Sequence, residues 1–188
     1  MGTHEPDFLV VGDRVALGPL RRDLAPIYAR WTNQLEVRRG LDHLGIASPQ
    51  SQEKWVEEKL EESAEREPRA AEFTIYDRSD SMPVGTAGLF QIGHAHGAAS
   101  FGIALGARRR QGLGTEATQL VLDFAFNVLH LRNVLLETLE WNVAGLKAYE
   151  RAGFRRIGVR RGAAFSRGRP TDLVLMDAIP EDFGASVL

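Results

Sequence analysis

Three consecutive strand-type segments, followed directly by a glycine-rich turn and an amphipathic helix, restrict the fold of this chain more than any other feature. Residues 73–77, 84–92 and 99–105 are rich in β-branched, aromatic and small apolar residues, and short turn sequences separate them. Short connections predict antiparallel neighbours. Residues 115–130 then repeat apolar side chains at helical spacing. The pattern predicts an α/β (α+β) fold in which helices pack on a mixed sheet.

The rest of the chain extends this pattern without an internal repeat or a long linker, so we expect one domain over residues 1–188 with a core of about 14–179. In total we expect seven strands and about four helices. The further strands are predicted at residues 14–20, 134–139, 154–165 and 172–179, and the further helices at 22–32, 48–66 and 142–152.

Composition excludes several classes of function. The chain has no cysteine, which removes disulfides, thiolate metal sites and cysteine nucleophiles. A net charge of −2 and the lack of a long apolar run argue against nucleic-acid and membrane partners, and favour a cytoplasmic protein. His94 and His96 form an H-x-H pair, but with no evident third ligand they are read as the rim of a hairpin, and no metal is expected.

Charge is divided unevenly along the chain. Residues 1–100 hold 11 basic and 16 acidic side chains, whereas residues 101–188 hold 12 and 9. An acidic first part favours a cationic ligand and a basic second part an anionic one, although solvated faces account for such a split equally well.

The most informative motif is the turn at residues 109–117, which leaves a strand, passes Gly112 and Gly114, and enters a helix. Free N–H groups and the dipole at a helix start attract anions, and glycine lets a phosphate approach the backbone. A purely structural turn explains two glycines as well. The P-loop and complete dinucleotide-binding motifs are both missing.

Four motifs in order resemble those of the GNAT superfamily of acetyltransferases. The R/Q-x-x-G-x-G/A motif is matched from Arg109 to Gly114 and continues as T-E-A, and N-x6-Y-x3-G-F is matched from Asn142 to Phe154. The segments Trp31–Arg38 and Gly168–Met176 resemble the W-x-N-D-P-E-V-R and G-R-x-x-D-x-x-x-M motifs of the subgroup that acetylates ribosomal-protein N-termini, while a tyrosine at the acid position also resembles spermidine acetyltransferases.

The resemblance implies a strongly bent sheet whose fourth and fifth strands, here residues 99–105 and 134–139, splay apart around acetyl-CoA. The pantetheine arm would bond the edge of the fourth strand, and the pyrophosphate would lie at the helix start, screened by arginines that include Arg108. The residues expected to contact the co-substrate are Ile103, Leu105, Arg109, Arg110, Gln111, Gly112, Leu113, Gly114, Thr115, Asn142, Lys147 and Tyr149.

The implied reaction is direct transfer of an acetyl group from the thioester to a primary amine in a ternary complex. Tyr149 would protonate the leaving thiolate, although a packing role also suits it, and the Leu105 N–H would stabilise the oxyanion. Several members of the family carry a glutamate where this chain has Ser100, so a water chain to a remote carboxylate is expected. The candidate carboxylates are Glu72, Glu137 and Glu140, with Glu137 the one assigned to catalysis.

The resemblance also implies that the first two helices and the last hairpin bind the acceptor. It would be a small cationic amine, an amino sugar or amino acid derivative, or a peptide N-terminus. The residues expected to contact it are Trp31, Glu36, Arg38, Asp42, Ser100, Phe165 and Arg167. A catalytically silent acyl-CoA-binding module is the alternative function, and the final hairpin offers an edge for a homodimer.

Overall fold

The computed structural model describes residues 6–40, 45–183 and 186, and within them a single sheet of eight strands has the order β1-β2-β3-β4-β5-β6-β8-β7. All neighbouring pairs are antiparallel except β5 and β6, which are parallel. The strands are β1 (Val10–Val11), β2 (Val15–Pro19), β3 (Ala70–Asp77), β4 (Met82–Gly93), β5 (Ala98–Leu105), β6 (Asn133–Leu139), β7 (Arg155–Ser166) and β8 (Arg169–Ala178).

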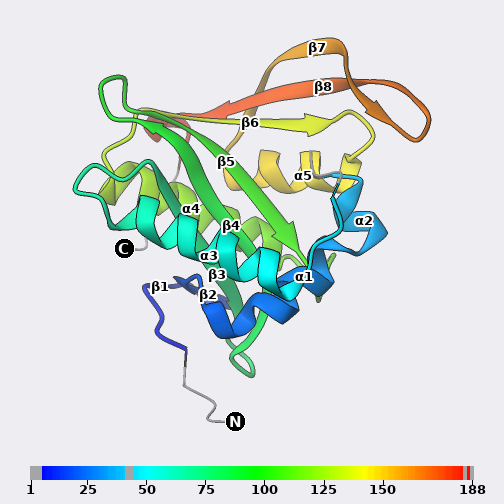
Figure 1. The fold of residues 1–188 in the computed structure, drawn as a ribbon. Helices are drawn as coiled ribbons and strands as arrows, with labels where there is room; N and C mark the ends of the chain where they lie inside the picture. Colours follow the sequence, from blue (N-terminus) through cyan, green and yellow to red (C-terminus); the bar gives the residue numbers. More distant parts are fainter. Residues whose placement is uncertain (1–5, 41–44, 184–185, 187–188) are drawn as a thin grey trace.

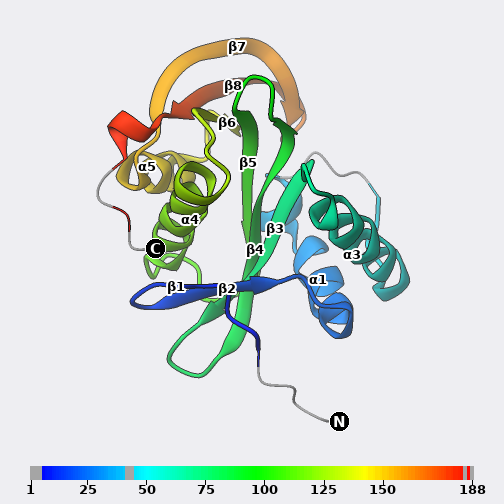
Figure 2. The same ribbon diagram turned by 90° about the vertical axis from the view of Figure 1, so that its left-hand side faces the viewer.

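Helices cover both faces of the sheet (Figures 1 and 2). α1 (Ala25–Thr32) and α3 (Pro49–Ala64) lie on one side, which we call the α1/α3 face, and the short α2 (Leu35–Arg38) follows α1. α4 (Leu113–Asp123) and α5 (Val143–Ala152) lie on the other side, the α4/α5 face. Single turns at Arg22–Leu24 and Pro180–Asp182 and a π-helical turn at Phe124–Val128 complete the described helices.

Local sequence accounts for where the long helices begin and end. α3 starts at a capping box in which Ser48 and Ser51 exchange side-chain and backbone hydrogen bonds, and Pro49 stands at its first position. α5 starts where Asn142 accepts from the N–H of Gly145, and it ends at Gly153, whose φ of +114° suits glycine.

Alternation along the central strands assigns each side chain to a face. On β5, Phe101 packs against Tyr149 and Phe154, so the odd-numbered residues of β5 face α4 and α5. On β3, Thr74 meets Tyr28 of α1 and Glu72 meets Lys59 of α3, so these residues look toward the α1/α3 face. The main core fills the α4/α5 side, and a smaller cluster around Tyr28 and Trp31 fills the other.

The parallel strands β5 and β6 pair only at their beginnings. Ala98, Ala99 and Ser100 pair with Asn133, Val134 and Leu135, and beyond this point β6 continues with β8 while β5 continues with β4. Figure 1 shows the two strands spreading apart toward their carboxyl ends. We call this separation the β5–β6 divergence. It confirms the splay predicted between residues 99–105 and 134–139.

The structure differs from the sequence prediction in the number of elements. The eighth strand is Val10–Val11, which pairs with β2 over two residues and is too short for a period-two pattern to reveal. The fifth α-helix, Leu35–Arg38, is a single turn, again shorter than a helical period can define. The predicted helix at 115–130 starts two residues earlier and changes to π-helical bonding, in which Leu129 N–H donates to the Phe124 carbonyl.

Among the described residues, no helix combines the length and the apolar character that crossing a membrane requires.

Candidate active site

The loop between β5 and α4 has the backbone of an anion-binding turn. Arg108, Arg110 and Gly112 have φ values of +49°, +62° and +86°, so positive φ recurs at every second residue. Such alternation turns successive N–H groups toward the same concave side. Gly112 is the N-cap of α4 and offers no side chain to cap it. The loop therefore ends at a helix start whose first N–H groups are available to a ligand.

The N–H groups of the first helical turn are not all equivalent. Thr115 and Glu116 donate to the carbonyl of Gly112 at 3.1 and 3.3 Å, which engages the Thr115 N–H that was expected to face phosphate. Leu113 and Gly114 precede these donors. A side chain at Gly114 would come within 3.1 Å of Leu105 on β5, so glycine lets the helix start lie close to the strand edge.

Two of the three consecutive arginines are held by protein carboxylates. Arg108 forms ion pairs with Asp77 and with Asp80 in the β3–β4 turn. Hydrogen bonds from Ser79 and from Arg108 lower the pKa of Asp77 to about 2, which keeps this anchor ionised. Arg108 thus fastens the loop to the turn, whereas Arg110 is exposed at the loop itself.

Arg109 joins the predicted co-substrate loop to the predicted acceptor segment. Its Nε donates to the Leu105 carbonyl at 2.7 Å, and its terminal nitrogens bond Glu36 and Gln34. The Gln34 amide also donates to the Gly106 carbonyl at 3.0 Å. The ring of Trp31 lies directly over Gly106, where a Cβ would come within 1.9 Å of it. Residues expected to act on two different substrates therefore form one contact network.

The free edge of β5 presents the backbone groups predicted for pantetheine. The N–H of Gly106 donates to the Val84 carbonyl of β4, and in an antiparallel ladder bonded residues alternate. The backbone groups of Phe101, Ile103 and Leu105 consequently point away from β4, toward the β5–β6 divergence. The structure places Ile103 and Leu105 together on this edge, half-buried and packed against the main core.

Tyr149 lies on α5 below the same edge, with its ring perpendicular to Phe101 at 6.3 Å between centroids. Burial raises the pKa of its phenol to about 12, so the hydroxyl keeps its proton at neutral pH. Asn142 caps α5, and its amide nitrogen also donates to Thr138 at 3.0 Å. Lys147 is exposed on the same helix.

The α1/α3 face carries a carboxylate close to this edge. Glu72 on β3 pairs with Gly88 of β4, which pairs with Gly102 of β5. Burial raises the pKa of Glu72 to about 7, against the lowering effect of Lys59, whose Nζ lies 3.8 Å away. Ser100 also faces this side, and its hydroxyl donates to Gln91 at 3.3 Å.

The structure places the other predicted carboxylates and several predicted acceptor residues away from the row formed by Glu72, Gly88 and Gly102. Both oxygens of Glu137 on β6 accept from Arg160 of β7, and Glu140 is exposed after β6. Phe165 is 76% exposed near the end of β7. Arg38 of α2 donates to the Gly45 carbonyl, and Asp42 lies outside the described residues.

One further contact of the hairpin was not anticipated. Arg167, in the turn between β7 and β8, stacks over the Trp141 ring at 4.1 Å, and thereby brings the hairpin to the start of α5.

The described residues contain no group of three histidine and acidic side chains arranged to hold a metal. The Nε2 of His94 instead lies 2.9 Å from the Pro68 carbonyl.

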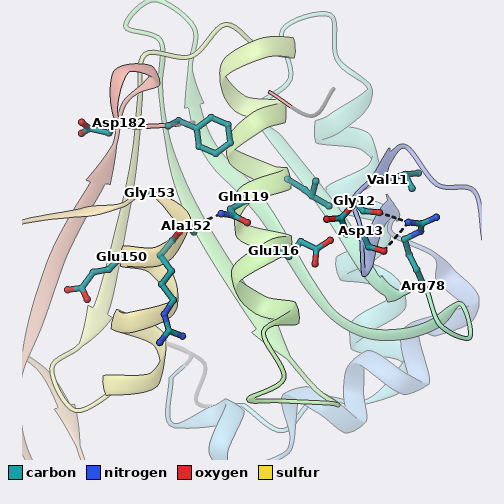
Figure 3. Close-up of a pocket in the computed structure, with 13 residues that line it drawn as sticks. Val11, Gly12, Asp13, Arg78, Glu116, Gln119, Glu150, Ala152, Gly153 and Asp182 are labelled. Atoms are coloured by element: carbon teal, nitrogen blue, oxygen red, sulfur yellow. Dashed lines mark hydrogen bonds between the residues drawn. The ribbon is translucent and has the colours of Figure 1, made fainter. Parts of the chain in front are cut away.

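A pocket of about 680 Å³ lies apart from the predicted site (Figure 3). It is open, lies over the middle of α4, and is bounded by the β1–β2 turn, the end of α5 and the Asp182 segment. Its polar side chains are largely engaged: Glu116 accepts from the Arg14 backbone, and Arg78 donates to the Gly12 and Asp13 carbonyls. None of its lining residues belongs to the predicted site.

Comparison with known proteins agrees with this geometry. Residues 14–155 match the family described as acetyltransferase (GNAT) domain. The probable N-acetyltransferase YjcK of Bacillus subtilis (strain 168) is 31% identical over 132 residues, which cover 68% of this chain and 69% of that protein.

Two solved structures establish the same fold at low identity. Spermidine N-acetyltransferase from Vibrio cholerae, in complex with CoA and spermine, has a TM-score of 0.81 and 20% identity over 92% of this chain and 99% of its own. Mycobacterium smegmatis RimJ, in complex with CoA-disulfide, has a TM-score of 0.81 and 22% identity over 92% and 85%. The family match and the relative in Bacillus subtilis show that this chain belongs to the GNAT family and is an acetyl-CoA-dependent acetyltransferase.

Proposed function

We propose that this protein transfers the acetyl group of acetyl-CoA directly to a primary amine, either of a small cationic molecule or of a peptide N-terminus. The observation that carries the proposal is the β5–β6 divergence, because it opens beside both an uncapped helix start and the half-buried Tyr149. The names of the structural relatives, a spermidine acetyltransferase and RimJ, suit the same two classes of amine.

The residues of the loop and edge fit the co-substrate. The N–H groups of Leu113 and Gly114 at the start of α4 would hold the pyrophosphate, and Arg110 is exposed beside them. The outward backbone groups of Ile103 would bond a pantetheine amide as a neighbouring strand does, and the N–H of Leu105 would reach the thioester end, since the Leu105 carbonyl accepts from Arg109. Acetyl-CoA supplies a thioester whose carbonyl carbon accepts the amine.

Two groups of this chain would assist at the thioester. The N–H of Leu105 points to the divergent edge and would donate to the carbonyl oxygen as negative charge develops there. The hydroxyl of Tyr149 would donate its proton to the departing sulfur, a role for which its raised pKa keeps the proton in place. Glu137 is given no part, since Arg160 engages both its oxygens.

Release of free thiol from acetyl-CoA tests the proposal. Purified protein is mixed with a panel containing spermidine, an amino sugar, free amino acids and short peptides with free N-termini. We expect one class to be acetylated, and we expect Tyr149→Phe to lower kcat about 10²-fold or more while acetyl-CoA binding is kept. Acetyl-CoA binding without thiol release from any amine would instead identify a silent acyl-CoA-binding module.

A further inference from the structure

Glu72 is a largely buried acidic side chain on the α1/α3 face of the central sheet. Its side chain is 12% exposed, and the nearest cation, Lys59 of α3, is shared with Glu62, which Lys59 contacts at 2.9 Å. The cluster therefore consists of two carboxylates and one ammonium. Glu72 is the member built on the sheet, and Glu62 is the member on the helix.

Glycines on the next two strands each give room to a neighbouring side chain on the α1/α3 face. A Cβ at Gly88 would lie 2.6 Å from Cγ of Glu72, so the glutamate side chain bends across β4 where no other side chain stands. At Gly102 a Cβ would lie 2.9 Å from Cζ of Phe90. Absence of that Cβ lets the Phe90 ring lie over Gly102, where it forms an apolar surface. Glu72 thus lies in the same cross-strand row of the α1/α3 face as Gly102 of β5.

The row of residues that joins Glu72 to β5 ends beside the point at which β5 and β6 separate. Ser100 is the last residue of β5 that pairs with β6, and the next two residues are Phe101 and Gly102. Phe101 contacts Tyr149 on the α4/α5 face, whereas Gly102 stands in register with Gly88 and Glu72 on the α1/α3 face. A proton donor and a carboxylate therefore approach the beginning of the β5–β6 divergence from opposite sides.

Resting on the acetyl transfer proposed above, we propose that Glu72 accepts the proton of the incoming ammonium across Gly88, through one or two water molecules. Strands lie about 4.8 Å apart, so about 10 Å separates the Glu72 backbone from β5. The glutamate side chain covers roughly half of this distance, and water covers the remainder. Ser100, which has no basic side chain, leaves this task to a residue two strands away.

Protons and bonds balance in this scheme. The ammonium gives one proton through water to the Glu72 carboxylate and attacks the thioester carbon with its freed lone pair, which forms a C–N bond. The C–S bond breaks, and the sulfur takes the hydroxyl proton of Tyr149. The surplus proton on nitrogen replaces the one that Tyr149 gave, and Glu72 releases its proton to solvent.

The electrostatic surroundings of Glu72 suit this exchange at neutral pH. Burial raises the pKa of Glu72 to about 7, the charge of Lys59 lowers it, and that of Glu62 raises it. The side chains that share its face on β4 and β5, namely Thr86, Phe90, Ser100 and Ala104, are uncharged. Lys59 is partly buried, which lowers its pKa, but Glu62 and Glu72 raise it above the ordinary value, so it stays a cation.

The test is the pH dependence of kcat/KM in the thiol-release assay, with an amine that the wild type acetylates. The wild type should lose activity below about pH 7. Glu72→Gln keeps the shape of the side chain, and its kcat/KM at pH 8 should be lower by tenfold or more. The decrease in kcat/KM below about pH 7, which we call the acid limb, should disappear in this variant. Glu72→Asp should keep the limb at reduced activity.

The neighbours of Glu72 provide matched controls with opposite signs. Glu62→Gln should keep activity within about twofold at pH 8 and move the acid limb to lower pH, because a negative charge is removed. Lys59→Met should move the limb to higher pH. Thermal unfolding of each variant separates loss of folding from loss of proton transfer.

The outcomes distinguish this proposal from the one on which it rests. A wild type that releases no thiol with any amine overturns both. A wild type that is active, with a Glu72→Gln variant that retains its activity and acid limb, overturns the role of Glu72 alone. An acid limb that stays in place in both Glu62→Gln and Lys59→Met has the same consequence.

Discussion

Replacing Glu72 by glutamine should stabilise the folded protein at neutral pH and leave its stability unchanged in acid. The unfolded chain ionises Glu72 above its ordinary pKa of 4.5, whereas the folded protein keeps the proton until about pH 7. Between these values the folded state binds more protons, so the free energy of unfolding falls as the pH rises. A difference of about 2.5 pH units at about 1.4 kcal/mol each amounts to about 3 kcal/mol.

Glutamine resembles the protonated glutamate, so the free energy of unfolding of the Glu72→Gln variant should not fall as the pH rises through this range. Urea unfolding at several pH values between 4 and 8 measures it directly. At pH 4 the two proteins should agree, and at pH 8 the variant should be more stable by up to about 3 kcal/mol, or roughly 6–12 °C in Tm.

Glu137→Gln is the control, because its carboxylate lies in a partly exposed ion pair with Arg160 and should contribute at most about 1 kcal/mol. If the difference in stability between wild type and Glu72→Gln is the same at pH 4 and pH 8, the pKa of Glu72 is not raised on folding and this prediction is wrong.

Three further substitutions test the loop and its supports. Gly106→Ala should destabilise by about 3 kcal/mol in urea unfolding, because its Cβ would overlap the buried ring of Trp31, and a loss below about 1 kcal/mol would contradict this packing. Gly112→Ala should cost about 1–2 kcal/mol, since φ is +86°, and should weaken acetyl-CoA binding in calorimetry; unchanged affinity would argue against the loop as the anion site. Glu116→Ala removes the acceptor that the Arg14 N–H bonds at 2.8 Å, so hydrogen exchange at that amide should accelerate while α4 amides keep their protection.

Local sequence predicts those parts of the site that neighbouring residues determine. The helix start after Gly112 and the cap at Asn142 depend on backbone groups within a few positions, so their motifs identify them directly. The β5–β6 divergence was predicted through the family resemblance. It involves strands separated by a whole helix, and strand periodicity contains no such information.

Contacts between distant segments could not be predicted. Glu72 was one of three remote carboxylates in the sequence, and only the register of β3, β4 and β5 places it opposite two glycines. The glutamates Glu72 and Glu137 look alike as residues of strands, and the partners Lys59 and Arg160 distinguish them.

The arginine run shows the same limit. Its residues look equivalent in the sequence, yet Arg108 is held by Asp77 and Asp80, and Arg109 by Glu36. A run of arginines in a loop therefore predicts a positive charge there. The contacts made in the folded protein determine which of these arginines can still bind a ligand.

Calorimetric titration of acetyl-CoA into the wild type and into Gly114→Asp tests whether the start of α4 binds the pyrophosphate of the co-substrate. The aspartate would place a negative charge at the start of α4, beside the N–H groups assigned to the pyrophosphate. We expect saturable binding of one acetyl-CoA per chain by the wild type and none by a folded Gly114→Asp variant. Equal affinity in the two proteins, or no binding by the wild type at millimolar acetyl-CoA, would contradict it.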